Sequence, residues 1–206
     1  MSRFQISDPA YAARVRGCFD DQALMRTLGA RLSRLEPGEA DIAFAFDDAF
    51  TQQNGFLHAG IATALVDTAC GLAAYTLMPA DADVLSVEFK VNLLRPAVGE
   101  RFLACGRVIK PGSTLVVTQG ELLAWPRADT DGDGQPVAIM QATMIRRQAV
   151  PVPSPACSSP SRAHPRCPRA PAPGCRRTGR RGRARGGVSS SSCRLVPAQD
   201  LAGERE

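Results

Sequence analysis

The spacing of apolar positions in the first quarter of the chain predicts one helix and one strand. Residues 8–29 have helical spacing: Asp8 is available as a cap, Pro9 suits the first helical position, and Gly29 suits the end. Residues 30–47 then alternate between apolar and polar, most clearly in EADIAFAFDD. This period of two is typical of a strand with one buried face.

The rest of the ordered pattern predicts a long helix followed by strands. Small and apolar residues run from about His58 to Met78, and Pro79 with the acidic residues after it ends the helix. Because no β-α-β alternation follows, we expect an α+β fold in which this helix packs on one face of an antiparallel sheet. Four further segments have strand spacing and are expected to form a meander: 84–96, 99–110, 113–125 and 136–147.

The pattern stops at about Ala149. Residues 149–206 contain eleven arginines and three acids, whereas residues 1–148 contain 14 basic and 17 acidic residues. The net charge of +5 therefore comes from the tail, and we expect no nucleic-acid partner for the folded part. We expect the tail to be disordered because it has too few large apolar residues to offset its chain entropy. An idle extension is favoured over a nucleic-acid or membrane-surface arm, since no aromatic residue is interleaved for stacking.

Targeting and metal signals are weak. The N-terminus has no apolar stretch like that of a signal peptide, and no run approaches 18 apolar residues, so we expect a cytoplasmic protein without a membrane partner. The acidic loop from Asp129 resembles the start of a calcium loop, but its twelfth position is Met140 rather than Glu. The tail cysteines have irregular spacing. We expect no metal.

The stretch QNGFLHAGIATALVDTACGLAA, residues 53–74, carries the candidate chemistry. Asp67 stands in the middle of the expected helix, on a face made otherwise of small residues: Gly60, Thr63, Ala64, Cys70, Gly71 and Ala74. A carboxylate facing such a surface is costly unless it is paired or reaches a solvated cleft. At the helix start, the N–H groups of Ala59 and Gly60 lack partners within the helix and can form an oxyanion hole. His58 and the Gln52–Asn54 cluster could orient a carbonyl or a water.

The distance between these two elements predicts an assembly. Asp67 lies eight residues after Ala59, which is roughly 12 Å along a helix at 1.5 Å per residue. A base and an oxyanion hole that far apart cannot both contact one carbonyl. Two copies of the helix packed antiparallel would bring Asp67 of one copy to the helix start of the other. If both elements are catalytic, the protein is at least a dimer.

These residues resemble a known family. The segments G55-F-L-H-A-G60 and A64-L-V-D67, with S86-V-E-F-K-V-N-L-L-R-P96 and K110-P-G-S-T, are similar to the hotdog-fold acyl-CoA thioesterases of the phenylacetyl-CoA (PaaI-like) type. The resemblance covers about residues 38–147. It implies a long helix wrapped by a curved antiparallel sheet, and dimers or tetramers with sites at the dimer interface. It divides the chain into residues 1–37 (N-terminal helix and lead-in strand), a thioesterase domain at 38–148 and the tail.

The resemblance also implies roles. Asp67 corresponds to the catalytic carboxylate, either a general base or a nucleophile, and the Ala59 N–H to the donor that polarises the thioester carbonyl of the partner's site. Gln52, with Asn54 as a nearby alternative, would hold the nucleophile or carbonyl, and Ser86 would orient water. The family usually has His-Gly-Gly where this chain has His58-Ala59-Gly60, so a methyl group lies near the expected carbonyl position.

The expected substrate is an acyl-CoA or aryl-CoA, with no cofactor. The sequence leaves the acyl group open. Two other functions stay open: a hotdog acyl-CoA hydratase, although no His follows Asp67, and a non-catalytic acyl-CoA-binding protein. The candidate ligands for the CoA phosphates are Arg95, Arg107 and Lys110. The candidate lining residues of the acyl pocket are Phe56, Leu57 and Leu85.

Overall fold

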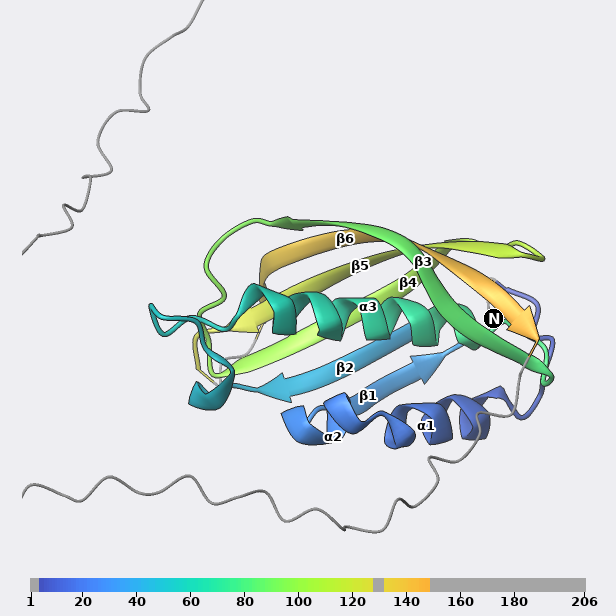
Figure 1. Ribbon diagram of the computed structural model, residues 1–206, viewed down its shortest axis with the longest axis horizontal. Coiled ribbons are helices and arrows are strands. Elements are labelled where there is room, and N and C mark those ends of the chain that lie inside the picture. The colour runs from blue at the N-terminus through green and yellow to red at the C-terminus, as the bar shows by residue number, and fades with distance from the viewer. Residues whose placement is uncertain (1–3, 128–131, 149–206) are drawn as a thin grey trace, which may run out of the picture. The chain divides into compact units, whose positions relative to one another are not determined.

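The computed structural model describes residues 4–127 and 132–148. One long helix, α3 (Ala59–Tyr75), lies against a curved antiparallel sheet of six strands, as Figure 1 shows. This is the α+β arrangement that the sequence pattern predicts.

The start of the acidic loop, at Asp129 and Asp131, and the tail 149–206 lie outside the described residues. The other elements are α1 (Tyr11–Asp21), α2 (Ala23–Leu28), β1 (Arg31–Glu36), β2 (Glu39–Ala45), the 3-10 turn η1 (Asp48–Phe50), β3 (Ala82–Leu93), β4 (Arg101–Lys110), β5 (Leu115–Trp125) and β6 (Gln135–Gln148).

The strand order is β1-β2-β4-β5-β6-β3, with every neighbouring pair antiparallel. The expected meander of four strands is therefore wrong for β3, which pairs with β6 at the far edge of the sheet rather than with β4. Figure 1 shows β3 crossing in front of the C-terminal half of α3. This topology places β3 beside the helix that carries Asp67 and leaves its other edge unpaired among the described strands.

The single strand expected over residues 30–47 is also wrong, because the chain turns back at Gly38. Gly38 has a φ of 80°, a conformation that glycine adopts without strain. Its N–H donates to the buried Oγ1 of Thr76, 2.7 Å away, at the end of α3. The result is a hairpin of β1 and β2, in which Leu35 opposes Ala40.

The helix expected over residues 8–29 is two helices. Gln22 has an extended backbone, with a φ of −73° and a ψ of 106°, and it separates α1 from α2. Asp8 and Pro9 precede the first helix, which begins at Tyr11. Gly29 ends α2 in the left-handed conformation, as the sequence predicts.

Two glycines of the sheet allow α3 to lie close to it. A side chain at Gly106 of β4 would overlap the backbone of Ala69, and one at Gly120 of β5 would overlap Val66 and Cys70. The helix face around Leu65, Val66 and Ala69 is fully buried as a result. Within the described residues, no helix is both long and apolar enough to cross a membrane.

Candidate active site

The start of α3 presents one backbone donor that the chain itself does not use. His58 caps the helix: its Nδ1 accepts a hydrogen bond of 2.9 Å from the Gly60 N–H. The His58 carbonyl accepts from Ile61 and Ala62. Among the described residues, no hydrogen bond uses the Ala59 N–H. Of the two donors predicted here, the Gly60 N–H is therefore occupied, and the Ala59 N–H remains available at the positive end of the helix dipole.

Asp67 is paired with a hydroxyl from another element. Ser86 of β3 donates a hydrogen bond of 2.8 Å to Oδ1 of Asp67. The Ser86 oxygen also lies 3.4 Å from the sulfur of Met144, a much weaker acceptor than a carboxylate. No described basic group forms an ion pair with Asp67. The carboxylate is half-buried, with Oδ2 left for a further partner.

The small-residue face of α3 is only partly covered by the sheet. Cys70 and Ala74 are turned inward and fully buried. Gly60 is exposed, whereas Asp67 and Gly71 are half-buried, and a side chain at Gly71 would meet no atom within 4 Å. The helix is continuous between Ala59 and Asp67, so the two groups lie about 12 Å apart within one chain.

A cavity of about 450 Å³ opens beside the helix start. It brings together five of the predicted residues, and most of its other walls are apolar. Asn54 and Leu85 do not line it. Its lining residues are Gln52, Phe56, Leu57, Ala59, Ala62, Leu93, Leu94, Arg95, Pro96, Ala97 and Val137.

Gln52 and Arg95 are the polar side chains of this cavity. The Oε1 atom of Gln52 accepts from the N–H of Asn54, so the amide group is anchored within its own turn and its NH₂ remains as a donor. Nη1 of Arg95 donates to Gln135 over 3.2 Å. Asn54 is exposed, and its backbone N–H donates to Gln52.

The three cations predicted for phosphate binding lie in three different places. Arg95 lines the cavity at the helix start. Arg107 lies on the outer face of the sheet, where its Nη1 donates to Asp41 over 2.5 Å and its Nε lies 3.7 Å from Glu39. Burial lowers the pKa of Arg107, but the hydrogen bond and charge of Asp41 outweigh it and raise the pKa overall. Lys110 is exposed at the end of β4. Arg107 is thus neutralised by acids and is poorly suited to bind a phosphate.

A basic pocket between the start of β3, the β4–β5 turn and the end of β6 contains residues that the sequence analysis did not identify. About 450 Å³ in volume, it is lined by Asp81, Ala82, Ser113, Thr114, Arg146, Arg147 and Gln148. The turn of Ser113 and Thr114 meets the end of β6 through a hydrogen bond of 2.8 Å from the Arg146 N–H to the Thr114 carbonyl. The sequence signal for this pocket was the motif KPGST at residues 110–114. Its partners Arg146 and Arg147 could not be paired with it, because they lie on a strand more than 30 residues later.

This basic pocket lies on the same face of the sheet as the candidate carboxylate. Met144, which contacts Ser86, and Arg146 are two residues apart on β6 and so point to the same side, about 7 Å apart along the strand. Asp67, Ser86 and Arg146 are therefore expected on the same face of the sheet, with Arg146 further along β6.

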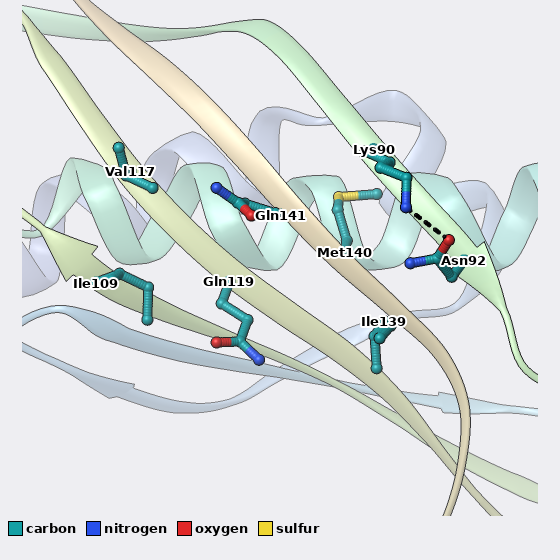
Figure 2. A pocket seen from close by; sticks show the side chains of 8 residues that line it. All are labelled: Lys90, Asn92, Ile109, Val117, Gln119, Ile139, Met140 and Gln141. Carbon is teal, nitrogen blue, oxygen red and sulfur yellow. Dashed lines mark hydrogen bonds between the residues drawn. The ribbon is translucent and has the colours of Figure 1, made fainter.

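A further hollow, of about 330 Å³, lies on the opposite side of the sheet. Figure 2 shows it with α3 behind the strands, and with Lys90 donating to Asn92 over 3.0 Å. Gln119 and Gln141 are its other polar side chains, facing each other across β5 and β6. Its described lining contains no carboxylate, hydroxyl or thiol, and its one ionisable side chain, Lys90, is hydrogen-bonded to Asn92.

The described thiols are mostly buried, and the described side chains form no cluster of metal ligands. No group of three or more His, Cys, Asp or Glu side chains there could hold a metal ion. Burial raises the pKa of the Cys70 and Cys105 thiols to about 12, so both are poor nucleophiles.

Comparisons with known proteins show what this chain is similar to. Residues 54–125 match the model of the thioesterase superfamily. A protein of Halobacterium salinarum named "Putative esterase" is 32% identical over 144 residues, 68% of this chain and 91% of its own length. A crystal structure of a thioesterase family protein from Silicibacter pomeroyi is 47% identical, with a TM-score of 0.64 over 68% of this chain and 99% of that one.

A more distant structure shares the fold. The E. coli PaaI protein from the phenylacetic acid degradation operon is 17% identical, with a TM-score of 0.60 over 69% of this chain and 96% of that one. The family match and the two relatives above show that the chain belongs to the thioesterase superfamily, and the structural likenesses show that it has the hotdog fold.

Proposed function

We propose that this protein is an acyl-CoA thioesterase of the PaaI-like type, which hydrolyses a thioester to a carboxylic acid and CoA. The observation that carries the proposal is the Asp67 carboxylate, which Ser86 holds by one oxygen beside an open helix face. The unused Ala59 N–H supplies the complementary donor. Such a pair provides a base or nucleophile and an oxyanion donor, the two groups that acyl transfer requires.

The two groups act together across a dimer. They are about 12 Å apart in one chain, too far to contact the same carbonyl. The edge strand β3 supports self-association because it is long, unpaired at its outer edge in the described chain, and apolar: Leu85, Val87, Phe89 and Leu93 are each 43–54% exposed. Such an edge is prone to pair with another strand. Pairing β3 with β3 of a second copy brings two α3 helices together antiparallel.

The chemistry follows from this arrangement. The thioester carbonyl oxygen accepts a hydrogen bond from Ala59 of one subunit. Oδ2 of Asp67 in the other subunit takes a proton from water as the water oxygen bonds to the carbonyl carbon, or itself attacks that carbon. In the first route the carbon–sulfur bond then breaks, and the proton held by Asp67 passes to the leaving CoA thiolate. In the second route the thiolate leaves and takes a proton from water, and the hydroxide so formed hydrolyses the acyl–aspartyl anhydride, which releases the carboxylic acid and restores the Asp67 carboxylate. Ser86 fixes the carboxylate orientation during both steps.

The two pockets fit the two ends of the substrate. The apolar cavity at the helix start, with Phe56 and Leu57, suits the acyl or aryl group. The basic pocket suits the CoA phosphates, because Arg146 and Arg147 outnumber its one acid, Asp81, and neither forms an ion pair with any described residue.

A thiol-release assay tests the proposal. The full chain is incubated with aryl-, medium- and long-chain acyl-CoAs, and free CoA is detected with a thiol reagent. We expect turnover with at least one substrate, and a loss of 100-fold or more on Asp67→Asn, on the order of the effect of removing a catalytic group. Asp67→Asn with undiminished turnover would refute the role of this carboxylate.

The same assay separates the other two functions. Binding of acyl-CoA without thiol release favours a non-catalytic binding protein. Hydration of an enoyl-CoA without thiol release favours a hydratase. The hydratase is less consistent with the site, because the positions after Asp67 on α3 supply no histidine.

A further inference from the structure

The residues ahead of α1 form one wall of a hollow that the proposed chemistry does not use. This hollow, of about 340 Å³, lies next to the basic pocket and shares Ser113 and Arg146 with it. One wall is Phe4, Gln5 and Ser7, and the facing walls come from the end of α3 and the β4–β5 turn. The N-terminal segment thus extends the basic pocket into a second compartment.

This wall is held at both ends. The Phe4 ring packs on Gly38, where an added Cβ would be 2.5 Å from the ring. At the other end, Asp8 accepts a hydrogen bond of 2.9 Å from Arg14, and Arg14 donates over 2.8 Å to the Met78 carbonyl at the end of α3. A segment tied at Phe4 and Asp8 is a pre-organised surface for a ligand.

The side chains that line the hollow suit a flat ring that forms hydrogen bonds at its edge and is attached to a phosphate. Its walls are mixed: Phe4, Pro79 and Pro111 give apolar surface, and Gln5, Ser7 and Ser113 give polar surface. The side chains of Gln5 and Ser7 are exposed, and no hydrogen bond within the described residues uses them. Apolar walls with a few polar groups are the usual composition of a site for a small heteroaromatic ligand. The adjoining Arg146 fixes where the phosphate would lie.

We propose that this hollow binds the adenine of the CoA nucleotide, with Phe4–Ser7 as its recognition wall, and that it makes the protein prefer CoA thioesters to thioesters of pantetheine alone. The inference rests on the proposed function, because it assigns a nucleotide to the substrate of that site. Apolar contact with the ring favours adenine, and Gln5 and Ser7 can hydrogen-bond to its edge.

The distances are compatible. Ala82, which lines the basic pocket, is four residues from Ser86 on β3, about 13 Å along the strand, and Ser86 is hydrogen-bonded to Asp67. The 13 bonds between the CoA sulfur and its first phosphorus span roughly 15 Å when extended at about 1.2 Å per bond, the value of an extended polypeptide. A thioester held at Asp67 can therefore deliver its phosphates to the basic pocket and its adenine to the hollow beyond.

The test compares one acyl group on CoA and on pantetheine, in the full chain and in two double variants. Gln5→Ala/Ser7→Ala removes the polar groups of the wall. Gln119→Ala/Gln141→Ala is the matched control, since both residues lie in the hollow on the opposite face of the sheet (Figure 2). We expect the first variant to lose about five- to tenfold in kcat/KM for acyl-CoA through KM, with kcat and the pantetheine substrate unaffected, and the control to behave as wild type. Wild-type protein that hydrolyses both substrates equally well, or a wall variant that keeps its full CoA preference, would overturn the inference.

A binding measurement separates this inference from the proposed function. If wild-type protein hydrolyses none of the thioesters, the proposed function fails, and calorimetry with adenosine 3′,5′-bisphosphate tests the hollow alone. Weaker binding by the wall variant than by the control supports the adenine site. Absence of binding to the wild-type chain, or equal binding by both variants, contradicts it.

Discussion

Ala59 is the first residue of α3, and its N–H is the proposed oxyanion donor. Proline is tolerated at the first helical position because that N–H has no partner within the helix. The preceding residue must then be extended, and His58 already has a φ of −62° and a ψ of 135°. Ala59→Pro therefore removes the proposed oxyanion donor, the N–H of residue 59, while keeping the backbone conformation of the helix start.

The expected cost is large in rate and small in stability. Removing one oxyanion donor lowers kcat by about 100- to 1,000-fold, or about 2.7–4 kcal/mol. A proline whose conformation fits changes unfolding free energy by less than about 1 kcal/mol. The thiol-release assay measures kcat of each variant, and urea denaturation measures its free energy of unfolding. Ala59→Gly keeps the N–H and should retain most activity. If Ala59→Pro folds and keeps wild-type kcat, the oxyanion assignment is wrong.

Two further predictions concern the scaffold. Gly106→Ala should lower the unfolding free energy by about 1–3 kcal/mol, because the new methyl overlaps the backbone of Ala69. Gly17→Ala, in open space on α1, should not destabilise the protein. Urea denaturation of the two variants and the wild type measures the difference. The hydrogen bond from Arg14 lowers the pKa of Asp8 below 3.8, so Asp8 stabilises the fold above that pH. Asp8→Asn should therefore be less stable than wild type at neutral pH, with the difference shrinking as the pH falls below 3.8; a constant difference across that range would contradict the pairing.

The sequence predicted α3 and the sheet around it because their signals are local. A long run of small and apolar residues and a following proline limit the helix to Ala59–Tyr75 within a few residues. The sequence analysis passed over the hairpin at Gly38, although Pro37-Gly38 is a turn signal, because apolar and polar residues alternate on both sides of it. The place of β3 at the sheet edge was missed because strand pairing depends on contacts far apart in sequence, here between Ala82–Leu93 and Gln135–Gln148.

In the candidate site, too, the features set by local sequence were predictable and those set by distant contacts were not. Helical spacing alone relates Ala59 to Asp67, and the distance between them required no structure. The family resemblance assigned Ser86 a role in orienting water, and the structure gives it a hydrogen bond to Asp67. The pairing of Arg107 with Asp41 was not readable, because the two residues are 66 apart and meet only through β2 and β4.

The central claim is that each site combines Asp67 of one subunit with Ala59 of another, and a mixing experiment tests it most directly. Asp67→Asn and Ala59→Pro proteins, each nearly inactive, carry different tags and are unfolded together, refolded and purified for both tags. A mixed dimer contains one intact site, so a random mixture should recover about one quarter of wild-type activity, and the doubly tagged fraction about one half. Doubly tagged dimers that remain as inactive as either parent would contradict a site shared between subunits.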